Sequence, residues 1–251
     1  MMMHEIKEQL RDKGYVVVKG FVSASSMNAL REFWLDYFKS VAPKDRVLWG
    51  PYLGQPNQVG YTKDKFQCLY RAHDFLWNAP IHGETRDVAL KMNELRNEVL
   101  DEDPSFGTRL TDVNYRIWTS VSYYPAKGFM ASHRDTASYE NMIHGVLPIT
   151  FPTVDYQDGG LFLRTRQELT VYPERTMSSG DVFLYDPGLT HGVSPIVSEG
   201  VGRLQMFPLM ASAEINRSTL QRVRWSEFLK AKFDVSKDRV NVLLGRQQAY
   251  R

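Results

Sequence analysis

The chain has 251 residues, 43% hydrophobic and 12% aromatic, so it is long enough to bury a sizeable core. Its 31 basic and 29 acidic residues give a formal charge of +2, which excludes a strong whole-chain field for nucleic acid or anionic membranes. The single Cys68 rules out an internal disulfide, and no apolar run forms a signal peptide or reaches the ~18–20 residues of a membrane span, so we expect a cytoplasmic protein.

The N-terminal part is predicted to be mainly helical. Apolar spacing predicts a short helix over 5–12, a longer helix between 23 and 43, and a clear helix over 84–100. A β-branched strand at 15–18 separates the first two helices. Residues 44–80 show weak periodicity with many glycines and prolines, so they are either a lid or binding loop, or a surface excursion packed on the body.

Short strands dominate from about residue 112. Residues 112–124 alternate cleanly between two faces, as a strand does. Turn signals separate the later strands, which we expect at 130–135, 145–152, 161–164, 169–173, 182–185, 191–196 and 201–210. Around eight short strands with regular turns predict a sandwich or barrel.

The tail returns to helix over 218–232, followed by an apolar run at 240–244. No repeat or linker divides the chain, so we expect one domain. Its N-terminal helices, strand and candidate lid occupy 1–111, the β core 112–211 and the C-terminal helices 212–251.

Three residues form a candidate metal site. His133 and Asp135 are two apart on a predicted strand, so their side chains point the same way. His191 must come from a strand that closes the other side of the core. Two imidazoles and one carboxylate are the ligands of non-haem Fe(II) oxygenases, and they leave three positions open for cosubstrate and O₂.

Arg203 stands twelve residues beyond His191, about one hairpin further along. An arginine fork suits a planar carboxylate because it donates two parallel hydrogen bonds. The alternative for Arg203 is an ordinary surface strand arginine. Gln205 and Phe207 share its strand face by parity, so they are candidates to line the same cavity.

In this order and spacing, His133, Asp135, His191 and Arg203 resemble the Fe(II)/2-oxoglutarate-dependent oxygenases. Two connecting segments, 158–161 and 179–184, also match that family, and residues 12–18 with the following helix resemble its phytanoyl-CoA-dioxygenase-like branch. The resemblance implies a mainly β fold with helical covers: a double-stranded β-helix, that is, a jelly roll of cupin-like form.

The resemblance also implies roles for these residues. His133, Asp135 and His191 would bind Fe(II), and Arg203 would hold the distal carboxylate of 2-oxoglutarate. Decarboxylation of this cosubstrate with O₂ would give succinate and CO₂, and the oxidant would hydroxylate a C–H bond. Related halogenases replace the ligand carboxylate with a small residue, so Asp135 favours a hydroxylase.

Further candidate substrate contacts are Arg71, Arg116 and Trp118. Arg116 and Trp118 lie on the polar face of the strand before the metal strand, which is either a cavity wall or a solvent face. Arg71 lies in the irregular segment and would close over an anionic or amino-acid-like substrate, or form a structural ion pair. We expect a small-molecule substrate rather than nucleic acid or a membrane, and the sequence specifies no oligomeric state.

The alternative functions differ in the cosubstrate that they use or in the product that they form. A cupin-like metal enzyme without 2-oxoglutarate, such as a thiol dioxygenase or isomerase, would give Arg203 no purpose. A non-catalytic jelly roll would not be expected to keep all three metal ligands. A nucleic-acid demethylase lacks support because no basic cluster with interleaved aromatic residues is present. Desaturation, ring closure and epimerisation begin from the same hydrogen abstraction as hydroxylation, so the sequence does not separate them.

Overall fold

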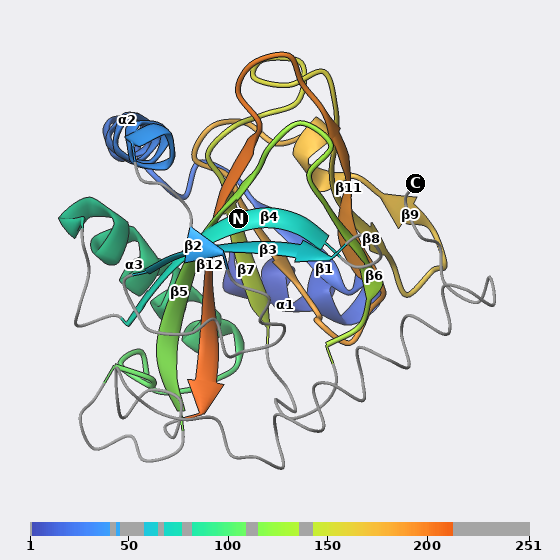
Figure 1. The fold of residues 1–251 in the computed structure, drawn as a ribbon. Coiled ribbons are helices and arrows are strands. Elements are labelled where there is room, and N and C mark those ends of the chain that lie inside the picture. The colour runs from blue at the N-terminus through green and yellow to red at the C-terminus, as the bar shows by residue number, and fades with distance from the viewer. Residues whose placement is uncertain are drawn as a thin grey trace, which may run out of the picture.

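A computed structural model describes residues 2–40, 44–45, 58–64, 68–76, 82–108, 115–135 and 143–212 (Figure 1). Its helices are α1 (Met3–Lys13), α2 (Ala24–Ser40), α3 (Gly83–Val99) and the 3-10 turn η1 (Pro173–Arg175). Its strands are β1 (Tyr15–Val18), β2 (Lys44–Asp45), β3 (Gln58–Asp64), β4 (Cys68–Leu76), β5 (Tyr115–Tyr124), β6 (Phe129–His133), β7 (His144–Pro148), β8 (Asp158–Arg164), β9 (Thr170–Val171), β10 (Val182–Tyr185), β11 (His191–Val197) and β12 (Arg203–Ser212). The helices expected beyond residue 212 lie outside the described residues.

The first helix and strand form as the sequence predicts. Ile6 and Leu10, one turn apart, are the buried residues of α1. Gly14 ends the helix in a left-handed conformation (φ 82°), and its N–H donates to the Leu10 carbonyl at 2.9 Å. A glycine suits this position because a side chain is strained there. The chain then enters β1 directly, which pairs antiparallel with β10.

The strands form one continuous, curled sheet in the order β1-β10-β7-β12-β5-β4-β6-β11-β8-β9. Its two halves face each other across a shared interior. Val146 of β7 and Phe183 of β10 pack with Leu161 and Leu163 of β8 in one buried cluster. Inward-facing residues of the two halves therefore share one interior.

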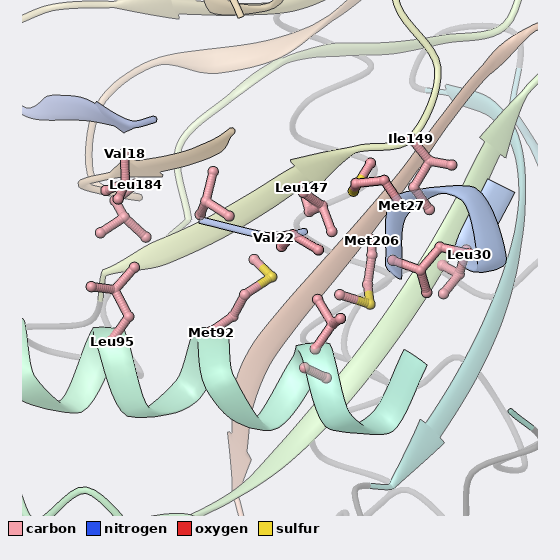
Figure 2. Close-up of a cluster of buried hydrophobic side chains, with 14 of the residues drawn as sticks. Val18, Val22, Met27, Leu30, Met92, Leu95, Leu147, Ile149, Leu184 and Met206 are labelled. Carbon is pink, nitrogen blue, oxygen red and sulfur yellow. The ribbon is translucent and has the colours of Figure 1, made fainter. Parts of the chain in front are cut away.

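The helices cover the outer face of β1, β10, β7 and β12. Met92 and Leu95 of α3 pack toward Leu147, Leu184 and Met206 of the sheet (Figure 2). Figure 1 shows α3 beside β5 and β12. The residues between these outward-facing positions on each strand point into the interior instead. None of the described helices is both long and apolar enough to cross a membrane.

The segment 44–80 contains more regular structure than its sequence predicts, because residues 58–64 and 68–76 form an antiparallel pair, β3 and β4. β4 also pairs with β5 and with β6 and so links the two halves of the sheet. The polar residues of this segment hid its strand pattern. Residues 46–57, 65–67 and 77–80 of the candidate lid lie outside the described residues.

Candidate metal centre

Two neighbouring strands bring the predicted ligands together. His133 is the last residue of β6 and His191 the first of β11, and the antiparallel register sets them directly opposite each other. Asp135 follows two residues after the end of β6, and its N–H donates to the Pro187 carbonyl at 3.1 Å. Main-chain pairing and hydrogen bonding therefore hold both sides of the site in place without a metal ion.

The ligand atoms of His133, Asp135 and His191 all lie within 4.8 Å of one another. His133 Nε2 is 3.5 Å from Asp135 Oδ1, and His191 Nε2 is 3.6 Å from Oδ2. The side chains are 20%, 35% and 6% exposed respectively, so the site opens toward solvent on the Asp135 side.

Each metal-facing imidazole is oriented by its own strand. Nδ1 of His133 lies 2.9 Å from the Ala131 carbonyl, and Nδ1 of His191 lies 2.9 Å from the Leu189 carbonyl. A carbonyl oxygen only accepts, so each Nδ1 carries the proton and donates. Nε2 is left with a free lone pair, which is the tautomer a metal ligand needs.

The electrostatics favour a neutral His191 imidazole beside a negative Asp135 carboxylate. Burial, reinforced by the neighbouring His133, lowers the pKa of His191 to about 3. Burial acts to raise the pKa of Asp135, but His144, His133 and His191 together outweigh it and lower that pKa. The site therefore combines a neutral His191 imidazole with an anionic Asp135 carboxylate at neutral pH.

His144 is a part of the site that sequence reasoning missed. It begins β7, and its Nδ1 lies 3.4 Å from Asp135 Oδ2. Its ring meets Phe207 edge-on, with centroids 5.0 Å apart. Because the sequence pattern places the strand from residue 145, His144 looked like an isolated histidine. His144 and Val146 are two residues apart and face the same side of the strand. Because Val146 is buried in the interior, this spacing would have identified His144 as an interior residue.

The face of β12 predicted to line the cavity does point inward. Arg203 is completely buried, with its guanidinium carbon 5.1 Å from the Tyr124 ring centroid. Its Nη2 donates to Gln205 Oε1 at 2.5 Å. Phe207 continues this face toward His144. Arg203, Gln205 and Phe207 thus run along one wall toward the metal site.

Arg203 also forms an ion pair that the sequence did not predict. Its Nε donates to both carboxylate oxygens of Glu174 at 2.9 Å, and its Nη2 donates to Oε1 at 2.5 Å. Burial acts to lower the pKa of Arg203, but the Glu174 carboxylate more than offsets it, so this pKa is raised. Nη1 is buried and has no hydrogen-bond partner among the residues that the structure describes.

Among the other predicted substrate contacts, the structure describes only the side chain of Arg71, which contacts α2. Arg71 donates from Nη1 to the Phe38 carbonyl at 2.6 Å, and its guanidinium carbon is 5.2 Å from the Phe38 ring centroid, so it packs against α2. Arg116 and Trp118 lie on β5 opposite Ala211 and Leu209, and their side chains are outside what the structure describes.

The residues present fit a Fe(II) ion and a carboxylate ligand. Two imidazoles and a carboxylate on adjacent strands match the facial ligand set of non-haem iron, with the exposed side left for further ligands. The unpartnered Nη1 of Arg203 is a buried donor on the inward face of β12, which also carries Phe207 beside His144. Buried donors are rarely left without an acceptor, so a carboxylate oxygen suits this position.

No family model and no curated protein matches the sequence. Among solved structures, the chain is similar to a Pseudomonas putida prolyl-4-hydroxylase, with a TM-score of 0.57 and 16% identity over 82% of this chain and 97% of that one. It is also similar to the non-heme alpha-ketoglutarate-dependent epimerase SnoN from nogalamycin biosynthesis (0.57, 10%, 89% and 90%) and to AviO1 from Streptomyces viridochromogenes (0.54, 16%, 84% and 95%).

These similarities define the class of fold. The curled antiparallel sheet with its helices on one outer face is the jelly roll of 2-oxoglutarate-dependent oxygenases, which confirms the fold predicted from the sequence.

Proposed function

We propose that the protein is a Fe(II)- and 2-oxoglutarate-dependent oxygenase that hydroxylates an unactivated C–H bond of a small molecule. The substrate class is an amino-acid-like compound or a natural-product intermediate. The observation that carries the proposal is the convergence of three ligand atoms from His133, Asp135 and His191 within 4.8 Å, with both imidazoles held in the metal-binding tautomer. The arrangement of α1, β1 and α2 supports a place in the phytanoyl-CoA-dioxygenase-like branch.

Fe(II) with 2-oxoglutarate and O₂ supplies an oxidant able to remove a hydrogen atom from carbon, with release of succinate and CO₂. The protein holds and orients the reactants and excludes water from them. His133 and His191 present Nε2, because each Nδ1 donates to a backbone carbonyl, and Asp135 presents its carboxylate oxygen. The exposed side of Asp135 is the side from which a substrate approaches.

Arg203 is the residue proposed to meet the distal end of the 2-oxo acid through Nη1. Gln205 and Phe207 occupy the wall between Arg203 and the metal ligands, so we assign them to the cosubstrate and substrate cavity. We retain Arg116 and Trp118 as candidate substrate contacts, since β5 lies beside β12. The packing of Arg71 against α2 supports a structural role better than a substrate contact.

The test begins with anaerobic protein, Fe(II) and 2-oxoglutarate, which should give a weak visible charge-transfer band. Succinate release is then screened with free amino acids, acyl carriers, nucleosides and natural-product scaffolds as substrates. His133→Ala and Asp135→Ala should abolish succinate release, while His4→Ala, on the exposed face of α1, should retain it. Iron binding without the band would refute the cosubstrate, and succinate release by Asp135→Ala would refute the metal site.

Hydroxylation is preferred over halogenation because Asp135 occupies the position that halogenases leave open. Desaturation, ring closure and epimerisation start from the same hydrogen abstraction. They differ in the product, because only hydroxylation leaves an oxygen atom from O₂ in it. Mass spectrometry after turnover under ¹⁸O₂ distinguishes them: a product two mass units heavier than in ¹⁶O₂ supports hydroxylation, and an unlabelled product contradicts it.

A further inference from the structure

We propose that Glu174 sets the cosubstrate selectivity of this site by neutralising Arg203 and leaving it one free nitrogen, Nη1. The inference rests on the proposed use of a 2-oxo acid and concerns how its distal end is recognised. Glu174 lies in η1, and its side chain reaches Arg203 at the start of β12. Both side chains are buried, with exposures of 2% and 0%.

Glu174 is held from several directions, so the ion pair is a fixed part of the interior. Its Oε2 accepts a hydrogen bond from the Tyr156 hydroxyl at 3.1 Å and from the Leu161 N–H at 3.2 Å. Gly160 leaves the space for this carboxylate, because a Cβ at that position would lie 2.5 Å from Oε2. Separating a buried ion pair leaves an uncompensated charge, which is strongly unfavourable. We therefore expect Glu174 to stay in place when a cosubstrate binds.

This pairing consumes most of the donors of Arg203. The edge formed by Nε and Nη2 is taken by Glu174, and Nη2 also donates to Gln205. The Tyr124 ring lies against the guanidinium. Nη1 alone remains without a partner among the described residues. The two-donor carboxylate clamp expected from the sequence is therefore made to Glu174 rather than left open for a ligand.

The charge balance has a consequence for selectivity. A free buried guanidinium would attract a carboxylate strongly and would favour a dicarboxylate by roughly ten- to a hundredfold for each charge-assisted contact. Here the formal charges of Arg203 and Glu174 cancel, and a distal carboxylate would also lie near the Glu174 carboxylate. A 2-oxo acid with an uncharged end should thus lose little more than one hydrogen bond from Nη1 and bind within about tenfold of 2-oxoglutarate. Glu174 acts through Arg203, so it is a positioning residue and not a catalytic one.

The experiment compares 2-oxoglutarate with 2-oxopentanoate, which has the same carbon chain without the distal carboxylate. Both chelate Fe(II) through the 2-oxo acid end, so anaerobic titration of the charge-transfer band gives a dissociation constant for each. We expect the two constants of the wild-type protein to agree within about tenfold. In Glu174→Gln, which restores the positive charge of Arg203, the preference for 2-oxoglutarate should rise by at least about tenfold.

The matched control is Glu32→Gln, which removes one negative charge from an exposed position of α2 and should leave the wild-type ratio unchanged. A wild-type preference for 2-oxoglutarate of more than about tenfold, or an unchanged ratio in Glu174→Gln, overturns the proposal. If Glu174→Gln does not fold, the wild-type ratio alone decides. Absence of the band with both acids refutes the proposed function itself, and the selectivity proposal falls with it.

Discussion

The buried imidazole of His73 should make the free energy of unfolding depend on pH. It lies on β4 under α2 and is completely buried. Its Nδ1 and the Tyr37 hydroxyl are 2.8 Å apart, and the Trp34 ring lies 5.5 Å away between centroids. Burial in this aromatic environment lowers the pKa of His73 from 6.5 to about 4. The folded protein therefore keeps this imidazole neutral over a range in which the unfolded chain protonates it.

The direction and size of the change in stability with pH follow from proton linkage. Above pH 6.5 neither state protonates His73, so its full contribution to stability is present. As the pH falls from 6.5 to about 4, only the unfolded state takes up the proton, and the folded state loses stability. A difference of about 2.5 pKa units corresponds to about 3 kcal/mol in total, of which about 2 kcal/mol is lost between pH 7.5 and pH 5.

The assay is urea unfolding of the wild type and His73→Gln at pH 7.5 and at pH 5. Glutamine keeps an acceptor for the Tyr37 hydroxyl but cannot take up a proton. The wild type should lose about 2 kcal/mol more than His73→Gln between the two pH values. Other groups titrate in both proteins and cancel in the difference. His4→Gln, at an exposed position of α1, controls for the loss of an imidazole as such. Equal losses in wild type and His73→Gln would refute the reasoning.

Two further substitutions test buried polar contacts of the fold. Gly160→Ala should destabilise the fold by about 3 kcal/mol in urea unfolding, because φ is 107° there and the new Cβ would meet the Glu174 carboxylate; an unchanged midpoint would contradict this contact. Asp181→Ala should cost about 2–3 kcal/mol, because this buried carboxylate accepts hydrogen bonds from two backbone N–H groups and from Lys19. Burial acts to raise the pKa of Asp181, but these hydrogen bonds outweigh it and lower that pKa. The contribution of Asp181 to the free energy of unfolding should therefore disappear as the pH falls below about 4. Loss of this contribution already at pH 6 would contradict the prediction.

The sequence predicted the parts of the fold that follow a local pattern. The alternation of 112–124 corresponds to β5, and the β-branched run at 15–18 is β1. His133 and Asp135 were placed together by strand parity, and the position of His191 beyond several strands was enough to expect the third ligand. Each of these inferences needs only the spacing of residue types along the chain.

The remaining features depend on partners far apart in sequence. Glu174 stands in a short turn between Pro173 and Arg175, where a glutamate is expected to be solvated, and only the closed sheet places it against Arg203. In β4, the face that packs on α2 carries Arg71 and His73. These polar residues hide the apolar alternation of the strand, because their burial is made possible by aromatic residues of a separate helix.

The orientation of the two metal-facing histidines has a consequence for how such a site can change. Each imidazole is fixed by the carbonyl two residues earlier on its own segment, at Ala131 and Leu189. Main-chain geometry therefore sets their tautomer. Residues around the proposed iron site can be exchanged for others of different size and polarity while these contacts to the main chain persist. New substrates could thus be accommodated by replacing the surrounding side chains, with the two histidines unaltered.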